Sequence, residues 1–470
     1  MKTGCSDRTE FQGLGNREVT GTFDGGMITS DGGGILLREV EERTGIIKRF
    51  SECFTDYRDE DRIEHTVAEL ASQRIMGLAL GYEDINDHDD LRCDPLLALI
   101  SGKEEPTGSD RRCERDRGKA LAGKSTLNRM ELTPEDADEK SRYKKITADH
   151  KAIDELLLDL FIGAHLTPPK QIILDADATD DPVHGDQEGK FFQGYYKCYC
   201  YLPLYIFCGG HLLCARLRPS NIDASDGTAD ELERIVGRIR KSWPNVEIII
   251  RGDSGFCREE IMSWCEMNDV DYVFGLAKNN RLIKLLSEEM RDAEAIYEET
   301  GEPVKIYGDF YYTTLKSWTG CRRVVGKAEH LLGAANPRFV VTSFDKNEIN
   351  TGDLYEKVYC ARGDMENRIK EQQLFLFADR TSTSEMRSNQ LRLYFSSIAY
   401  TLMHALRRLG LHGTEMEKSQ CDTIRIKLLK IGAQVRVTVR KVWISFSEGY
   451  PRREIFRMIY KRIAAIPVPA

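Results

Sequence analysis

The hydrophobic pattern of the chain contains two short apolar runs that end in acidic residues. The run Ile172–Leu174 predicts a buried strand, and acidic residues follow it directly. The run that begins at Val246 has the same design, because it leads to Asp253 and a glycine-containing turn. Carboxylates at the tips of buried strands repel one another unless a cation joins them. The pattern therefore indicates a site for a hard divalent cation with oxygen ligands. The acids after the first run are Asp175, Asp177, Asp180 and Asp181.

Helical spacing of apolar residues predicts that the first 150 residues are mainly helical. From residue 171 onwards, predicted strands and helices alternate, with helices over 225–243 and 258–267 and a further strand over 271–276. This order predicts an α/β fold with a mixed sheet. Residues 277–350 interrupt the alternation, and we interpret them as a β-rich insertion. Its expected strands are Val304–Tyr312, Arg322–Val325 and Arg338–Thr342.

The last 50 residues alternate between basic and apolar positions. The segments 423–430 and 435–443 therefore predict strands with one basic face. From residue 381 to the end there are 16 lysine and arginine residues against 6 acidic ones, although the whole chain has a net charge of −9. A basic end on an acidic body is compatible with a polyanionic partner, and a solvated basic surface is the alternative interpretation.

Composition excludes several classes of protein. No apolar run approaches the roughly 18 residues that a membrane span needs, and the first residues lack the apolar core of a secretion signal. The 13 cysteines are scattered without a Cys-x-x-Cys motif, which argues against a zinc site or a disulfide framework. We therefore expect a cytoplasmic protein. Trp443 is expected in the core, whereas Trp318, in an apparently exposed loop, is a candidate to stack on an unpaired base.

A third acid follows the insertion, on a segment with helical spacing. Steps of three or four residues bring Glu366 and its polar neighbours to one helix face. An exposed Arg–Glu pair of little energetic consequence is the alternative. A glutamate on a packed helix would complete a cluster of three carboxylates, which holds two Mg²⁺ ions in phosphoryl-transfer enzymes. The residues on this face are Tyr359, Arg362, Glu366, Lys370 and Gln373.

Several long motifs resemble those of the DDE transposases of bacterial insertion sequences, specifically the group-1 DDE transposase domain. The resemblance covers nearly the whole chain, and its motifs are Phe23-Asp-Gly-Gly-Met-Ile-Thr-Ser-Asp-Gly-Gly, Leu80-Gly-Tyr-Glu-Asp-Ile-Asn-Asp-His88, Asp177-Ala-Thr-Asp-Asp-Pro-Val-His-Gly185, Phe192-Gln-Gly-Tyr-Tyr196 and Arg251-Gly-Asp-Ser-Gly-Phe256. It implies a ribonuclease-H-like core in which Asp177, Asp253 and Glu366 bind two Mg²⁺ ions, with Mn²⁺ as a substitute.

The family's third motif, Tyr-x2-Arg-x3-Glu-x6-Lys, is matched at Tyr359, Arg362 and Glu366 but not at its last position, which is Gln373. Lys370, one turn earlier, is expected to make the phosphate contact instead. At the first tip, alternation sends Asp175 and Asp177 to the same side of the strand, so both could reach a metal. The resemblance selects Asp177 as the ligand, and Asp175 becomes a supporting acid.

The fold class expected overall is α/β, with a ribonuclease-H-like core and a mixed sheet. The expected organisation is a helical DNA-binding region at 1–165, the core at 166–276 and 351–410, the β-rich insertion at 277–350, and a basic C-terminal region at 411–470. Contacts with DNA are expected beside the acids, at Tyr359, Arg362 and Lys370. Phosphate contacts are also expected from the basic region, at Arg436, Arg440 and Lys441.

The expected function is that of a transposase. It would bind terminal inverted repeats, cleave the transposon ends and transfer the 3′-OH to target DNA by two-metal chemistry. Its partner would be double-stranded DNA, bound by a homodimer associated with a bacterial nucleoid and not with a membrane. A nuclease without strand transfer and a non-catalytic DNA-binding protein are the alternatives, and a phosphatase is a weaker one.

Overall fold

The computed structural model describes residues 8–331 and 334–468 and divides the chain into two compact units. One unit combines residues 1–147 with 398–470, and the other holds residues 148–397. The long helix α14 (Met386–Leu406) runs through the boundary. The acidic motifs all belong to the second unit.

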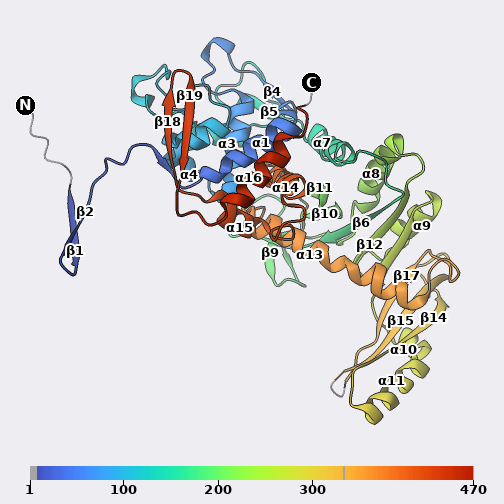
Figure 1. Ribbon diagram of the computed structural model, residues 1–470. Helices are drawn as coiled ribbons and strands as arrows, with labels where there is room; N and C mark the ends of the chain where they lie inside the picture. Colours follow the sequence, from blue (N-terminus) through green and yellow to red (C-terminus); the bar gives the residue numbers. More distant parts are fainter. Residues whose placement is uncertain (1–7, 332–333, 469–470) are drawn as a thin grey trace, which may run out of the picture. The chain divides into compact units, whose positions relative to one another are not determined.

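The second unit is built on a nine-stranded mixed sheet (Figure 1). Its strand order is β11-β10-β6-β12-β13-β17-β15-β14, with β16 paired to β15. The strands β6, β12 and β13 run parallel to one another, whereas the remaining pairs are antiparallel. The bounds are β6 Gln171–Ala178, β10 Leu204–Cys208, β11 His211–Arg216, β12 Glu247–Gly252, β13 Asp271–Leu276, β14 Val304–Tyr312, β15 Arg322–Leu331, β16 Ala334–Ala335 and β17 Arg338–Thr342.

Three helices pack on one face of the sheet between β11 and β13 (Figure 1). They are α7 (His150–Gly163), α8 (Thr228–Ser242) and α9 (Glu259–Met267). Their apolar stripes pack on the strand residues that alternate toward them, such as Ile248 and Ile250 of β12. Complete burial of this layer fixes the register of the strands, since a slip of one residue would expose the apolar side chains.

The opposite face of the sheet receives the segment that carries the third acid. Val273, Val325 and Val340 of three neighbouring strands pack against Leu354 and Tyr355. That segment is one continuous helical stretch with changing pitch. It consists of α12 (Thr351–Asp353), a π-helical part η5 (Leu354–Tyr359), a 3₁₀ turn η6 (Cys360–Arg362), α13 (Gly363–Lys370) and a second π-helical part η7 (Glu371–Phe375).

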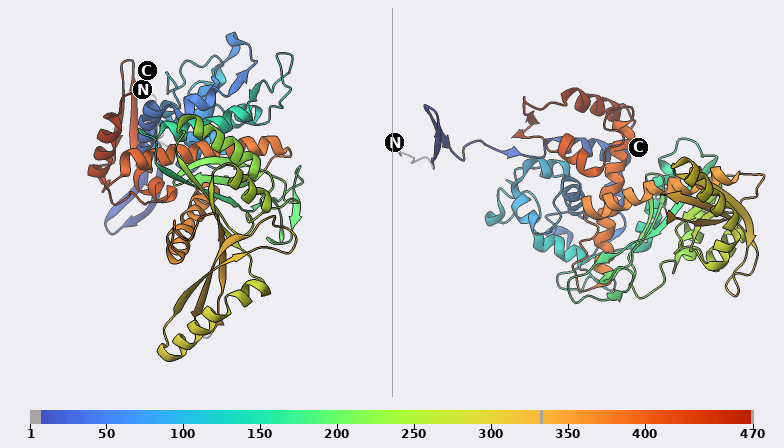
Figure 2. Two further views of the ribbon diagram at one scale, coloured as in Figure 1. Left: turned by 90° about the vertical axis from the view of Figure 1, so that its right-hand side faces the viewer. Right: turned by 90° about the horizontal axis from the view of Figure 1, so that it is seen from below.

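The residues of the expected insertion extend the central sheet. Two of its predicted strands coincide with β14 and β17. The helices α10 (Asn280–Leu285) and α11 (Ser287–Thr300), which the sequence analysis did not anticipate, precede them. Helix α11 lies along β14 and β15 (Figure 2). A small separate sheet also belongs to this unit and consists of β7 (Asp181–Pro182), β8 (Phe191–Gln193) and β9 (Cys198–Tyr201).

The first unit is mainly helical in its N-terminal part. Helix α3 begins with a capping box between Thr66 and Glu69 and ends at Gly81, whose φ of 100° favours glycine. The N-terminal helices are α1 (Ile35–Thr44), α2 (Ile46–Ser51), α3 (Val67–Leu80), α4 (Asp87–Asp90), α5 (Pro95–Ile100) and α6 (Lys124–Glu131). The short strands are β1 (Thr9–Leu14), β2 (Arg17–Gly21), β3 (Ile28–Thr29), β4 (Phe54–Asp56) and β5 (Ile146–Ala148).

The C-terminal part of the first unit differs from expectation at one segment. Residues 423–430 were predicted to be a strand, but all of them except Lys430 are helical: α15 (Cys421–Ile424) continues into the π-helical η9 (Arg425–Leu429). Ile424 and Leu428 are both buried, and their separation of four residues fits a helix as well as a strand. The second predicted segment does form strands, β18 (Ala433–Thr438) and β19 (Lys441–Phe446), which pair with each other, and β18 also pairs with β3. The remaining helices are η8 (Arg407–Leu411) and α16 (Arg453–Ala464).

Candidate active site

Two parallel strands bring the first two acids to the same edge of the sheet. In the β6–β12 register Asp175 is the partner of Arg251, and each strand has an aspartate two residues further along. These are Asp177, near the end of β6, and Asp253, directly after β12. The backbone N–H of Gly255 donates to Asp253 Oδ1 at 2.8 Å, which holds this carboxylate in a tight turn.

The third acid, Glu366, lies on α13. Its side chain is 70% exposed, so it reaches out from the helix into solvent. The π-helical stretches on both sides of α13 matter because such stretches change which side chains share a face, and they are frequent at functional sites. A uniform helical spacing, as the sequence analysis assumed, therefore does not describe this segment.

Arg362 links the first and the third acid. Its guanidinium lies 2.9 Å from Asp177 Oδ2 and 3.9 Å from Glu366 Oε1. Burial raises the pKa of Asp177 to about 6; Arg362 opposes this shift, and the negative charges of Asp253 and Glu366 add to it. The charges of Asp253 and Glu366 thus both act on Asp177, and Arg362 is the cation that partly compensates its carboxylate.

The three carboxylates do not lie as close to one another as ligands of one metal ion would. Among residues 8–331 and 334–468, no group of three or more histidine, cysteine, aspartate or glutamate side chains has an arrangement that could hold one. The guanidinium of Arg362 lies between Asp177 and Glu366. The donor set nevertheless consists of carboxylate oxygens, which hard divalent cations prefer.

Asp175 has a different environment from Asp177. It is buried and accepts two hydrogen bonds of 2.7 Å from Arg251, in a bidentate pair. Both of its oxygens are therefore engaged by the guanidinium. Arg251 was not among the predicted site residues, although an arginine inside a strand of branched apolar residues is the signal that could have identified it.

Tyr359 lies against the strand next to Asp253. A Cβ added to Gly275 of β13 would lie 2.6 Å from the Tyr359 hydroxyl, so glycine permits this close approach. Burial raises the pKa of Tyr359, and the nearby charge of Asp253 acts in the same direction. A second tyrosine, Tyr196, donates to the carbonyl of Ala178 at the end of β6. It was part of a quoted motif but was not recognised as a site residue.

The two candidate positions for the motif's lysine differ in environment. Gln373 donates from Nε2 to the main-chain carbonyl of Asp180 at 3.0 Å, which ties the third-acid segment to the chain just after β6. Lys370 is exposed at the last position of α13. A side chain available for a phosphate is therefore found at Lys370.

Trp318 is less exposed than its loop suggested. It is partly buried and packs against the main core, with its ring edge to face with Tyr312 at 5.7 Å between centroids. The guanidinium of Arg322 lies over its ring. These contacts occupy much of the surface that would stack on a base.

The basic candidates of the first unit lie on the β18–β19 hairpin. Arg436 and Trp443 are direct partners in its register, and Arg440 lies in its turn. Trp443 is 49% exposed, with Arg436 and Lys441 both over its ring. The expectation that Trp443 belongs to the core is wrong, because alternation in this hairpin sends it to the solvent face together with the basic residues.

Comparison with known proteins decides the family. The model of the family described as transposase DDE domain group 1 matches residues 11–468. The chain belongs to this family. It is therefore related throughout its length to enzymes that bind, cleave and transfer DNA, and such transposases generally use divalent metal ions.

Other comparisons are more distant. Among solved structures, the chain is similar to a piggyBac transposase in a synaptic complex with hairpin DNA, at 13% sequence identity and a TM-score of 0.42. The alignment covers 84% of this chain and 80% of that one. No curated protein matches the chain. Over the described parts of this transposase chain, no helix has the length and apolar character required to cross a membrane.

Proposed function

We propose that the chain cleaves the ends of a transposon and joins the freed 3′-OH to target DNA, at a site formed by Asp177, Asp253 and Glu366. The observation that carries this proposal is the pair of parallel strands β6 and β12, which present an aspartate each at one edge of the sheet. Arg362 lies between Asp177 and Glu366, which supports a position of the third acid close to the first.

The core that supports these acids is proposed to be ribonuclease-H-like. Support comes from the order β11-β10-β6-β12-β13, in which an antiparallel three-stranded part continues into parallel strands. Helices on one face and the third-acid segment on the other allow carboxylates from three separate segments to meet at the strand ends. In this arrangement rigid strands position two ligands and a packed helix adds the third.

The proposed cofactor is a pair of Mg²⁺ ions, for which Mn²⁺ can substitute. The acids suit such ions chemically, since all the donors are carboxylate oxygens. Burial raises the pKa of Asp177, so a nearby cation would favour its charged form. When bound, the ions would activate the attacking oxygen and stabilise the leaving oxygen at phosphorus. Cleavage and strand transfer are both in-line displacements, so one site serves both reactions.

The surrounding residues have separate roles in this proposal. Arg362 pairs with Asp177 and lies near Glu366, and it would contact a DNA phosphate when metal ions compensate these acids. Lys370 is exposed on the same helix and contacts the phosphate backbone, and Tyr359 borders the site beside Asp253. Trp318 has the weakest case, because protein contacts already occupy its ring.

Affinity for double-stranded DNA is proposed to come partly from the β18–β19 hairpin. Arg436, Arg440 and Lys441 are exposed there, which suits contacts with successive phosphates. We further propose that the bound DNA includes the terminal inverted repeats. Because two transposon ends have to be joined, the active form is proposed to be a homodimer on DNA.

The test is cleavage of a linear duplex that carries the element's own ends, in the presence of Mg²⁺. Asp253→Asn and Glu366→Gln should abolish cleavage and leave end binding largely intact. Asp364→Asn is the matched control, because Asp364 lies on the same helix as Glu366 and pairs with Arg368. Full cleavage by either site variant would refute the proposed site.

A second assay separates the alternatives. Paired ends incubated with target DNA should yield joined products. Cleavage without joining would identify a nuclease that lacks strand transfer, and DNA binding without either reaction would identify a non-catalytic protein.

A further inference from the structure

Arg251 and Asp175 form a charged pair inside the sheet. Both side chains are nearly buried, at 7% and 8% exposure. The guanidinium donates from Nε and Nη2 to the two carboxylate oxygens, each at 2.7 Å. Burying two charges costs several kcal/mol per ion before the pair forms, and apolar residues would often be at least as stable. Stability alone therefore does not explain why this pair occupies neighbouring positions of β6 and β12.

The same guanidinium makes a third hydrogen bond, to a residue outside the sheet. Arg251 Nη1 donates to the main-chain carbonyl of Val358 at 2.6 Å. Val358 belongs to η5, which packs on the opposite face from α8 and α9. A π-helical stretch departs from the regular α-helical hydrogen-bond pattern. The contact with Arg251 therefore holds in place a part of the segment that lacks this regular pattern.

The guanidinium and the two groups that it binds belong to the three segments that carry the acids. Asp175 is two residues before Asp177 on β6, and Arg251 is two residues before Asp253 on β12. Val358 belongs to η5, in the same helical segment as Arg362 and Glu366, and precedes Glu366 by eight residues. One buried side chain thus connects every segment that carries an acid, a short distance beneath the edge where the acids emerge.

The chemistry of the connection requires arginine. A guanidinium presents five donors in a rigid plane and can bind a carboxylate with one edge while it donates elsewhere with another. A lysine would keep the charge but could not hold both oxygens of Asp175 and the Val358 carbonyl in this fixed geometry. The spacing between the strands and η5 would then loosen.

We propose that Arg251 is a positioning residue that sets the distance of the Glu366 helix from Asp177 and Asp253 and thereby the affinity of the site for divalent metal. This inference rests on the proposed metal site and adds to it a residue that touches neither metal nor DNA. Groups that orient metal ligands typically influence metal affinity by about 10- to 100-fold when they are replaced.

The test is the binding of Mn²⁺ to the full chain without DNA, measured as free Mn²⁺ by electron paramagnetic resonance, together with thermal unfolding. Arg251→Lys should weaken Mn²⁺ binding by about 10- to 100-fold. Asp253→Asn is included to identify the proposed site, and it should remove the same binding.

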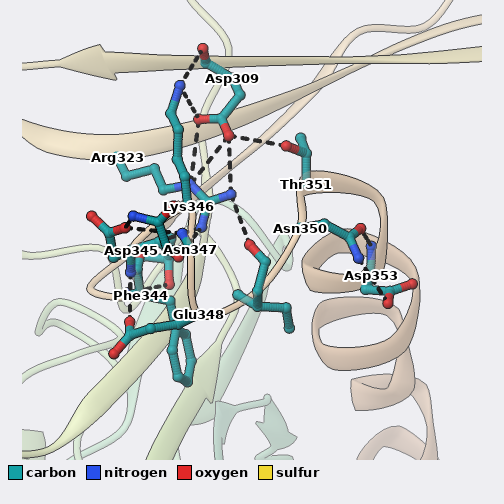
Figure 3. A network of polar contacts seen from close by, with 12 residues as sticks. Asp309, Arg323, Phe344, Asp345, Lys346, Asn347, Glu348, Asn350, Thr351 and Asp353 are labelled. Carbon is teal, nitrogen blue, oxygen red and sulfur yellow. Dashed lines mark hydrogen bonds and ion pairs between the residues drawn. The ribbon is translucent and has the colours of Figure 1, made fainter.

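Arg323→Lys is the matched control for stability. Arg323 is also buried in this unit, where it pairs with Asp309 and donates to the carbonyls of Phe344, Asp345 and Ile349 (Figure 3). Substitution of Arg323 therefore removes the same kind of hydrogen bonds, to one carboxylate and to main-chain carbonyls. Its partners, however, belong to neither β6 nor β12. Arg323→Lys should lower the unfolding temperature and leave Mn²⁺ affinity unchanged.

The possible outcomes distinguish the two proposals. If Asp253→Asn removes Mn²⁺ binding and Arg251→Lys behaves like Arg323→Lys, the positioning role of Arg251 is refuted and the metal site stands. If Asp253→Asn leaves Mn²⁺ binding unchanged, the metal site is refuted and the inference fails with it. Should Arg251→Lys fail to fold, Asp175→Asn breaks the same connection from the other side and is held to the same comparison.

Discussion

The guanidinium of Arg362 lies 2.9 Å from the carboxylate of Asp177, although the two residues are far apart in the sequence. The arginine precedes Glu366 by one helical turn and belongs to the motif that carries it. A positive charge from the third-acid segment thus compensates an acid of the sheet. This is the place that a metal ion is proposed to take, so in this proposal arginine and metal would compete for the same carboxylate.

Replacement of Arg362 by glutamine should separate metal binding from catalysis. Mn²⁺ should bind more tightly, by roughly tenfold if about 1.4 kcal/mol of charge competition is removed. Cleavage of end DNA should nevertheless fall, because the proposed phosphate contact is lost. Arg368→Gln is the control, since Arg368 lies on the same helix and pairs with Asp364. Weaker Mn²⁺ binding by the Arg362 variant would contradict the competition.

The two acids of β6 should respond differently to neutralisation. Asp177→Asn should eliminate cleavage, since it removes a proposed ligand. Asp175→Asn should leave measurable activity but destabilise the protein by about 3–5 kcal/mol, because it leaves the Arg251 charge buried without its full partner. Cleavage on the same pre-bound DNA and denaturant unfolding measure the two effects. The reverse ranking of activities would mean that Asp175 is the ligand.

The basic hairpin should determine part of the salt dependence of DNA binding. Loss of Arg436, Arg440 and Lys441 should reduce the slope of log affinity against log salt by about 0.9 for each phosphate contact removed. The comparison is the variant Lys170→Ala/Lys241→Ala, whose lysines are both exposed in the second unit, Lys170 directly before β6 and Lys241 in the last turn of α8. An unchanged slope in the hairpin variant would indicate that this surface is only solvated.

Asp181 should make the stability of the protein depend on pH. Burial raises its pKa to about 8, and the hydroxyl of Thr381 donates to its Oδ2 at 2.9 Å. Between its ordinary value near 4 and about 8, the folded state keeps a proton that the unfolded state has lost. Its contribution to stability is therefore fully present at low pH and decreases as pH rises through this range.

The comparison of wild type with Asp181→Asn isolates this group. The free energy of unfolding of the wild type, relative to the variant, should fall from about pH 4 to pH 8 and level off above. Chemical denaturation across that range measures it. Parallel curves would show that Asp181 does not titrate in this way.

Hydrophobic periodicity was sufficient for the strands with a clear pattern. The runs before Asp175 and Asp253 form neighbouring strands, and Val304–Tyr312 and Arg338–Thr342 match β14 and β17. These segments are short, rich in branched residues and bounded by turns, so local preference and burial agree. At residues 423–430 the local pattern fitted both a strand and a helix. There the packing of the tertiary structure selected the helix.

The aspartates at the ends of the two strands could be identified as site residues from the sequence alone. A charged aspartate after a buried strand is costly without a partner of opposite charge, and the residues next to it in the sequence do not supply such a partner. Which partner each acid has was decided only by tertiary structure. Asp175 and Asp177 are two residues apart and share a side of the strand, yet one pairs with Arg251 and the other with Arg362. Parallel strand pairing and the irregular pitch of η5 set those distances, and both depend on contacts between residues that are remote in the chain.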